Sequence, residues 1–201
     1  MTKAFWGGLC ILFSGGLYLL TNCMAESSPT HFTMYMEFEK EIPQIPEFIT
    51  IYESYYILLA LNFVIIKLPN AIRSLSISLI VSSVIASIIF IIFPGELGFS
   101  RSANTTGFEA IFSFLHTLDL PYNLYPSLHI TFSTISVFAI INQTKSKLFH
   151  ALLIFWLILI SFSVVLVHQH HIFDIITGYI LSWLTIHFIY LKGVNADNVT
   201  D

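Results

Sequence analysis

The chain has 201 residues, of which 56% are hydrophobic and only 10% are charged. Soluble globular domains carry about 25% charged residues, so the composition excludes an ordinary soluble protein and indicates an integral membrane protein. The formal net charge of −4 is spread without a basic run, and nothing in it predicts nucleic-acid binding.

Apolar stretches predict an all-α fold, a polytopic membrane protein that forms one domain over residues 1–201. A membrane-crossing helix needs about 20 mostly apolar residues. On this basis we expect six transmembrane helices, near residues 4–24, 48–66, 74–93, 127–143, 148–167 and 172–191. The first stretch has the outline of a signal peptide, and we interpret it as a retained helix.

Two polar connections interrupt these spans. Residues 26–47 contain an acidic run and two prolines, which predicts an interfacial loop or a short surface helix. Residues 94–126 form the longest connection, and the amphipathic stretch 108–118 within it is expected to lie at the membrane interface.

Positive charges predict the orientation. Six spans leave only Lys40 and Arg101 on one side and place six cations on the other, namely Lys3, Lys67, Arg73, Lys145, Lys147 and Lys192. The side richer in Lys and Arg should be cytoplasmic. The 94–126 connection and the turn that follows the fifth span would then meet at the extracytoplasmic face of a plasma or bacterial inner membrane.

That turn, His168–Asp174 (HQHHIFD), has the most unusual polar composition in the chain. Ionisable residues between apolar runs are costly and are usually functional. If the next helix begins near His170, Asp174 shares its face and holds one ring nitrogen of that histidine. The other ring nitrogen is then available for chemistry.

Two further segments supply groups that suit a phosphate. Arg101 stays charged and offers a fork of donors, although alone it is more often an interfacial anchor. Pro126 suits a first helical turn, so Ser127 and nearby N–H groups would form an anion site at a helix N-terminus. His129 follows at a position to donate a proton, although a lone histidine at a helix entry is more often structural.

Together these residues predict phosphoryl transfer through a covalent histidine. His170 would attack phosphorus while Asp174 fixes its tautomer. His129 would protonate the leaving oxygen. Arg101 and Ser127 would stabilise the equatorial oxygens. The scheme uses no metal and no cofactor.

The segments Tyr125–His129 (YPSLH) and His170–Asp174 (HHIFD) resemble the second and third signature motifs of the type 2 phosphatidic acid phosphatases, relatives of the vanadium haloperoxidases. The pattern is most similar to the branch of inositol-phosphorylceramide-synthase-like phosphotransferases and small bacterial membrane phosphatases. The resemblance implies six helices and an extracytoplasmic site. It also implies His170 as nucleophile, His129 as general acid and Asp174 as its partner.

The chain departs from the family pattern at two phosphate-binding cations. A lysine and a proline usually flank the arginine of the first motif, and here those positions hold Pro94 and Ser102. The usual Ser-Arg of the third motif is matched by Ser163 and Val164. Arg101 would therefore carry most of the positive charge. A protonated His168 is our candidate for part of the rest.

The function expected from the sequence is hydrolysis of a lipid phosphate monoester or diphosphate, with the lipid phosphate and membrane lipids as partners. The alternatives are transfer of a phosphorylated headgroup to an alcohol and non-catalytic lipid binding by a degenerate relative. A zinc site is a rival within enzymes, with ligands from His129, His168, His170, His171 and Asp174. A proton relay is a further rival, but it would need ionisable residues midway along several spans.

Overall fold

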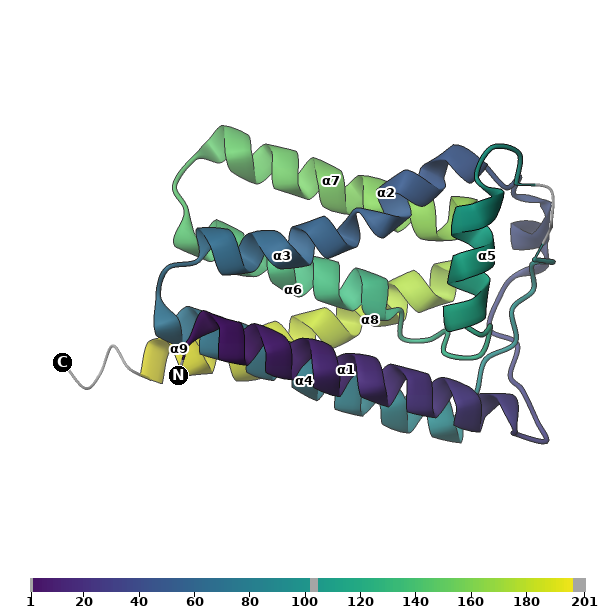
Figure 1. Cartoon of the computed structure of the whole chain (residues 1–201), viewed down its shortest axis with the longest axis horizontal. Coiled ribbons are helices and arrows are strands. Elements are labelled where there is room, and N and C mark those ends of the chain that lie inside the picture. The colour runs from purple at the N-terminus through teal and green to yellow at the C-terminus, as the bar shows by residue number, and fades with distance from the viewer. Residues whose placement is uncertain (1, 102–104, 197–201) are drawn as a thin grey trace.

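The computed structural model describes residues 2–101 and 105–196 as a bundle of long helices that run along one axis (Figure 1). The N-terminal and C-terminal helices begin and end at the same end of the bundle (Figure 1). The polar connections gather at the opposite end, which we call the loop end.

The described residues form the following helices and turns, given in chain order. They are α1 (Lys3–Glu26), the 3₁₀ turns η1 (Glu37–Glu41) and η2 (Pro46–Phe48), α2 (Ile49–Glu53), α3 (Tyr55–Ile65), α4 (Pro69–Ile92), α5 (Glu109–Leu118), α6 (Leu128–Gln143), α7 (Lys147–Leu166), α8 (Ile172–Thr185), the π-helical turn η3 (Ile186–Tyr190) and α9 (Leu191–Ala196).

Five helical segments among the described residues are long and apolar enough to cross a membrane, and they are Lys3–Glu26, Pro46–Ile65, Pro69–Ile92, Lys147–Leu166 and Ile172–Asn195. The remaining expected span is α6, a shorter apolar helix of 16 residues. At about 1.5 Å per residue it is about 24 Å long, less than the roughly 30 Å hydrocarbon core of a bilayer. Several apolar spans therefore support a polytopic membrane protein, and six crossings stay a prediction.

The third span begins earlier than the sequence predicted. The helix starts at Pro69, not near residue 74. Proline is favoured in the first turn of a helix because its missing N–H would have no acceptor there. The charge of Arg73 did not end the apolar segment, because a long cationic side chain can reach the interface from within a helix.

The second span is broken between α2 and α3. The Ser54 hydroxyl donates to the Ile51 carbonyl oxygen and accepts the indole N–H of Trp156 at 2.8 Å. A side chain that inserts into the backbone ladder is a common cause of a helix kink. The break lies between two tyrosines, Tyr52 and Tyr55, whose rings both pack against that of His129.

Helices α1 and α4 pack through small side chains. The Cys10 thiol lies 3.7 Å from the Ser76 carbonyl oxygen, and Ser14, Ser78 and Ser82 are buried along the two helices. Small residues let membrane helices approach closely when water supplies no hydrophobic driving force between them. This contact holds the N-terminal helix on the bundle.

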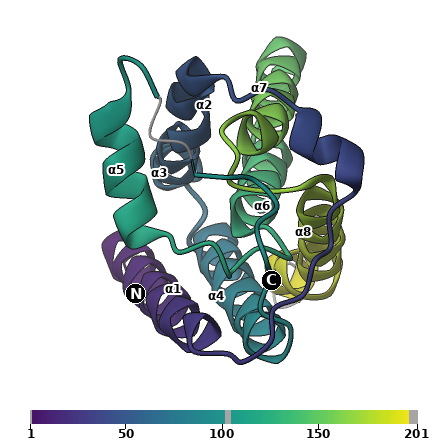
Figure 2. The same ribbon diagram turned by 90° about the vertical axis from the view of Figure 1, so that its right-hand side faces the viewer.

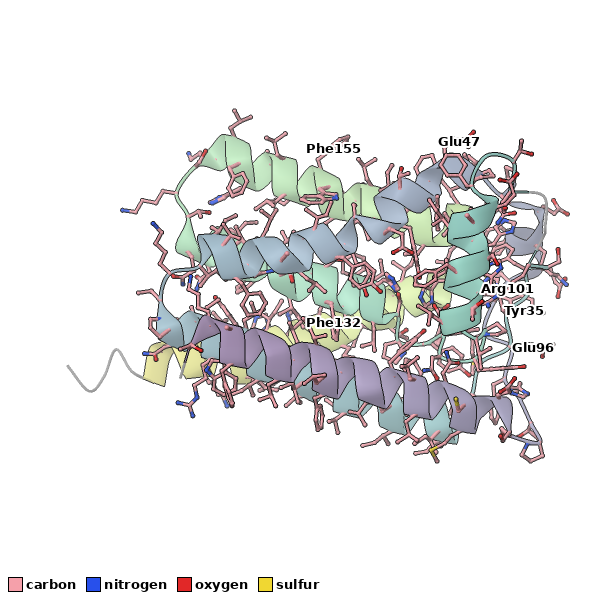
Figure 3. The ribbon with its side chains drawn as sticks, in the orientation of Figure 1. Tyr35, Glu47, Glu96, Arg101, Phe132 and Phe155 are labelled. Carbon is pink, nitrogen blue, oxygen red and sulfur yellow. The ribbon has the colours of Figure 1, made fainter. Side chains whose placement is uncertain are left out.

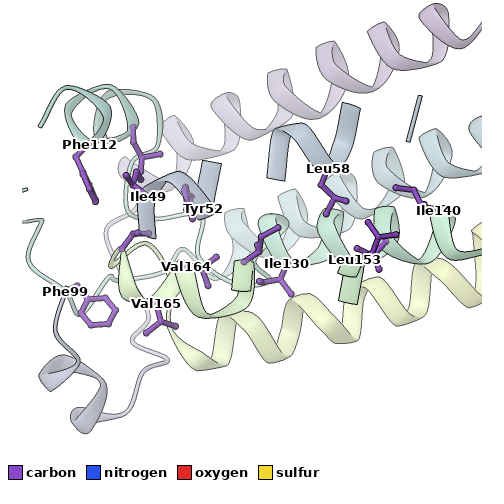
Figure 4. Packing of buried hydrophobic residues seen from close by; sticks show 14 residues of the cluster. Ile49, Tyr52, Leu58, Phe99, Phe112, Ile130, Ile140, Leu153, Val164 and Val165 are labelled. Carbon is purple, nitrogen blue, oxygen red and sulfur yellow. The ribbon is translucent and has the colours of Figure 1, made fainter. Parts of the chain in front are cut away.

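Helix α6 lies in the middle of the bundle, with α3, α4, α7 and α8 around it (Figure 2). A buried apolar cluster fills the space between α2, α3, α6 and α7 and extends to the loop end, where Phe99 and Phe112 join it (Figure 4). The core therefore fixes the N-terminus of α6 relative to the turn between α7 and α8.

The two polar connections pack against each other at the loop end. The Phe32 N–H donates to the Pro94 carbonyl at 2.8 Å, and the Glu96 N–H donates to the Phe32 carbonyl at 3.0 Å. The amphipathic stretch 108–118 forms α5, which lies across the ends of the bundle helices (Figure 1). The acidic run of the first connection forms the short turn η1, where the sequence predicted either a loop or a short surface helix.

Candidate active site at the loop end

The turn between α7 and α8 folds back on the last turn of α7. The N–H groups of Gln169 and His170 both donate to the Val164 carbonyl, at 3.0 and 2.9 Å. His168 has a left-handed backbone with φ of 59°, which few residues other than glycine adopt. Helix α8 begins at Ile172, the residue at which the sixth span was expected to begin, and His171 is its N-cap. His170 therefore precedes the helix and does not lie in its first turn.

The expected pair of His170 and Asp174 nevertheless forms. The Nδ1 of His170 lies 3.1 Å from Oδ2 of Asp174, and both side chains are buried. The same carboxylate oxygen accepts the His171 N–H at 2.9 Å and so caps α8. The Asp174 carboxylate, in the first turn of α8, therefore orients the ring of a residue that precedes the helix.

Ser127 is the N-cap of α6, whose first helical residue is Leu128. Pro126 therefore lies just before the helix and not in its first turn, where the sequence placed it. The Ser127 hydroxyl accepts the Ile130 N–H at 3.5 Å, and its own N–H donates to the Asp174 carbonyl at 3.1 Å. The side chain is fully buried. The hydroxyl of Ser127 thus caps its own helix and its N–H joins α6 to α8, so the residue does not point outward as the sequence suggested.

Gly178 makes the approach of α8 to α6 possible. A Cβ at this position would lie 2.8 Å from the Ser127 carbonyl oxygen and 3.0 Å from the Ile130 Cβ. The Gly178 carbonyl also accepts the Thr131 hydroxyl at 3.1 Å. Close backbone contact therefore sets the position of the first turn of α6 relative to the His170 turn.

His129 lies in a cage of aromatic rings beside His170. The centroids of the Tyr52 and Tyr55 rings are each 4.2 Å from that of His129. The Tyr52 hydroxyl lies 3.3 Å from His129 Nδ1. The His129 and His170 rings meet edge to face with centroids 6.0 Å apart. The structure thus brings together the two histidines that the sequence assigned to proton transfer and to nucleophilic attack.

Arg101 lies at the same end, close to α5 (Figure 3). Its Nη1 donates to the Asp119 carbonyl at 2.6 Å and its Nη2 to Gln169 Oε1 at 3.4 Å. Its Nε is buried and has no hydrogen-bond partner among the described residues. Burial lowers the pKa of the guanidinium, and the nearby Asp119 carboxylate opposes that shift. Arg101 is therefore held beside Gln169, the residue before His170, while its Nε–H has no partner among the described residues.

Asp119 was not predicted as a site residue. Its side chain is partly buried, and its carboxylate accepts a hydrogen bond from the Tyr18 hydroxyl. Burial raises its pKa, while the Tyr18 hydrogen bond and the charges of His170 and Arg101 oppose that shift. The carboxylate is thus within electrostatic range of both groups and balances part of the positive charge of Arg101.

His168 is not aimed at this cluster. Its Nε2 donates to the Ile42 carbonyl at 2.9 Å, and its ring stacks on Phe99 with centroids 4.0 Å apart. Burial lowers its pKa, which makes a positive charge at mildly acidic pH less favourable. The hydrogen bonding of His168 therefore does not support the predicted phosphate contact. Ser102, which stands where the family's first motif usually has a proline, lies outside the described residues.

Three residues that contact the site escaped sequence reasoning, namely Tyr52, Asp119 and Glu39, whose carboxylate lies 3.2 Å from His171 Nδ1. Glu39 stood in an acidic run that is typical of a solvated loop, and Tyr52 among apolar residues that read as ordinary membrane aromatics. No spacing in the sequence links any of them to the histidines.

The rival zinc site was tested by the arrangement of its proposed ligands. Among the described residues, no group of three or more His, Cys, Asp or Glu side chains is arranged to hold a metal ion. The rings of His168 and His171 both stack on Phe99. The Nδ1 atoms of His170 and His171 contact two different carboxylates, those of Asp174 and Glu39. The geometry thus favours proton transfer over metal binding.

Comparison with known protein families matches residues 52–196 to the PAP2 superfamily. The matched range contains His129, His170, Asp174 and Arg101, and it excludes α1 and η1. No curated protein matches the chain.

Proposed function

The chain belongs to the PAP2 superfamily, whose members are generally phosphatases or phosphotransferases acting on phosphate esters, and from that premise we propose that it is a membrane-embedded lipid phosphate phosphatase. It would hydrolyse a phosphate monoester or diphosphate at the extracytoplasmic face through a phosphohistidine intermediate.

The observation that carries this proposal is the geometry of two neighbouring histidines. His170 is bound to Asp174 through Nδ1, and its ring lies edge to face with that of His129. No hydrogen bond joins the His170 Nε2 to any other described residue. A buried histidine with one nitrogen fixed by a carboxylate and the other unoccupied is prepared for nucleophilic attack.

The reaction then proceeds in two balanced steps. The His170 Nε2 attacks phosphorus, the bond from phosphorus to the lipid oxygen breaks, and His129 gives that oxygen its proton. Water next attacks the phosphohistidine, His129 takes back a proton, and inorganic phosphate leaves. The Asp174 carboxylate stabilises the positive charge that develops on His170.

Tyr52 supports the general-acid role of His129. The Tyr52 hydroxyl lies 3.3 Å from His129 Nδ1 and can accept the Nδ1–H of the imidazolium. The Nε2–H of the same cation is then left to donate to a leaving oxygen.

Arg101 is the group that suits the phosphate oxygens. Its unpartnered Nε–H is a donor of the kind that charge-assisted phosphate binding uses. The first-turn N–H groups of α6, at Leu128 and His129, have no acceptor within the helix and add positive potential at its N-terminus.

The apolar surface supports a lipid substrate. Two apolar grooves flank α8, with volumes of about 410 and 500 Å³. The smaller one is lined in part by Tyr125, Pro126 and Phe173, which are close in sequence to Ser127 and Asp174. A lipid tail in this groove would leave the headgroup near His170.

A phosphotransferase is the second candidate. Two family cations are replaced by Pro94 and Val164, and Val164 is fully buried in the apolar core. This loss fits the phosphotransferase-like branch that the sequence resembles, in which an alcohol would replace water in the second step.

The test is phosphate release by detergent-purified protein from a panel of lipid phosphates in the presence of a chelator. His170→Ala and His129→Ala are the matched variants. We expect chelator-resistant release by the wild type and its loss in both variants. Headgroup transfer to an added alcohol, without release to water, would instead select the phosphotransferase. Lipid binding without either reaction would contradict both.

A further inference from the structure

A second histidine and carboxylate pair lies next to the first. Glu39 is fully buried, and its Oε2 lies 3.2 Å from His171 Nδ1 and accepts the Ile172 N–H at 2.8 Å. Its other oxygen, Oε1, accepts the Met36 N–H at 2.9 Å. A buried carboxylate is costly unless its oxygens are hydrogen-bonded, and these contacts satisfy both of them.

The second nitrogen of His171 is also occupied. Its Nε2 accepts the Gly98 N–H at 3.0 Å, so this nitrogen carries no proton and Nδ1 carries the proton that Glu39 accepts. We call Glu39, His171 and Gly98 the clasp. It joins η1, the loop that leads to Arg101, and the N-terminus of α8.

Ring stacking reinforces the clasp. The His171 ring stacks on Phe99 with centroids 4.4 Å apart and on Tyr35 with centroids 4.7 Å apart. A Cβ on Gly98 would lie 2.7 Å from the Tyr35 ring, so a residue without a side chain is needed for this approach. The loop that leads to Arg101 is thus held by its backbone at Gly98 and by its side chain at Phe99.

We propose that Glu39 is a positioning residue for phosphoryl transfer, acting through His171. On one side, His171 donates its N–H to Asp174, the partner of the nucleophile His170. On the other side, it holds Gly98, three residues before Arg101. Glu39 thereby fixes the distance between the nucleophile and the cation that binds phosphate, and this role rests on the proposed function.

The first test measures the clasp without reference to activity. Gln in place of Glu39 can accept hydrogen bonds only through one oxygen, so its NH₂ group must face either the Met36 N–H or the donors of His171 and Ile172. We expect Glu39→Gln to speed amide hydrogen exchange in residues 96–101 and 169–173. Glu37→Gln is the matched control, because Glu37 lies in the same turn and is exposed in a surface pair with Lys40. Equal exchange in the wild type and both variants would overturn the clasp.

The second test asks whether the clasp positions the site or only stabilises the fold. Orthovanadate, which imitates the five-coordinate transition state, is the probe. A displaced site weakens transition-state binding, and an error of about 1 Å can cost about 100-fold in rate. We expect kcat/KM to fall 10- to 100-fold in Glu39→Gln and the vanadate inhibition constant to rise by a similar factor. Glu39→Asp, which keeps the carboxylate, should recover part of both.

KM and the vanadate inhibition constant distinguish a residue that positions the site from one that only stabilises the fold. If Glu39 only keeps molecules folded, kcat falls as the active fraction falls, whereas KM and the vanadate inhibition constant stay unchanged, and the positioning role is overturned. Absence of phosphate release by the wild type would contradict the proposed function instead, and hydrogen exchange would still decide the clasp.

Discussion

Two adjacent histidines, His170 and His171, are each bound through Nδ1 to a buried carboxylate, at 3.1 and 3.2 Å. They differ at the second nitrogen. The Nε2 of His171 accepts a backbone N–H, and the ring is stacked between loop residues. The Nε2 of His170 has no hydrogen-bond partner among the described residues, and the ring faces His129. The comparison teaches that a carboxylate partner alone does not mark a candidate nucleophile, and that the state of the other nitrogen is what separates these two histidines.

The largest expected effect comes from exchanging each histidine for glutamine. His170→Gln removes the atom that attacks phosphorus, and loss of a covalent nucleophile costs about 10⁴-fold or more in kcat. His171→Gln removes a positioning contact and should cost about 10- to 100-fold. Phosphate release under saturating lipid phosphate measures both. Equal losses would break the distinction between the two pairs.

The carboxylates should differ in the same direction. In Asp174→Asn, the amide offers a donor as well as an acceptor, so the His170 tautomer is no longer fixed, and we expect a loss of about 10³- to 10⁴-fold in kcat. Glu39→Gln should cost less, because it acts only through His171. Steady-state kinetics on the two purified variants decide the order. A smaller loss in Asp174→Asn than in Glu39→Gln would contradict the assignment of His170 as nucleophile.

The difference between the pairs also explains what the sequence could predict. His170 and Asp174 are four residues apart, so a local pattern predicted their contact even though His170 lies before the helix. Glu39 and His171 are 132 residues apart, and Tyr52 and His129 are 77 apart. Those contacts depend on the packing of loops and on the break between α2 and α3, which no local spacing encodes.

The apolar spans were predictable for the same reason. Their length and composition are local properties, and they gave most of the helix bounds to within two residues. The start of α4 was missed because the sequence reading treated Arg73 as a boundary, whereas Pro69 begins the helix. The use of Ser127 was missed because its partner, the Asp174 carbonyl, comes from another helix.

A smaller effect tests how His129 is held. Tyr52→Phe keeps the ring that stacks on His129 and removes the hydroxyl that contacts Nδ1. One hydrogen bond is worth about 0.5–1.5 kcal/mol, so we expect a loss of about 2- to 10-fold in kcat for an alkyl phosphate. The loss should shrink for p-nitrophenyl phosphate, whose leaving group needs less help from an acid.

The matched control for this change is Tyr179→Phe, since the Tyr179 hydroxyl bonds to the Ser161 hydroxyl at 2.7 Å and its ring makes no contact with His129 among the ring pairs described. It should leave kcat unchanged for both substrates. A loss in Tyr52→Phe that is equal for the two leaving groups would contradict a role for the hydroxyl in proton donation.

The smallest expected effect is the response of the clasp to pH. Burial lowers the pKa of His171 below its ordinary value of 6.5, although the charges of Asp174 and Glu39 oppose the shift and that of His170 adds to it. The folded protein therefore binds this proton less readily than the unfolded chain. The stability that the neutral ring contributes is complete above pH 6.5 and is lost as the pH falls below it.

Protonation would also place an N–H on His171 Nε2 against the Gly98 N–H, so the clasp should open before the bundle does. We expect amide exchange in residues 96–101, corrected for the intrinsic rate, to increase between pH 7 and pH 5. Residues 155–165 of α7, which contain no titratable side chain, should keep their protection over this range. Constant protection of Gly98 down to pH 5 would mean that His171 is held by ring stacking and not by its hydrogen bonds, and the contrast with His170 would then rest on the aromatic rings.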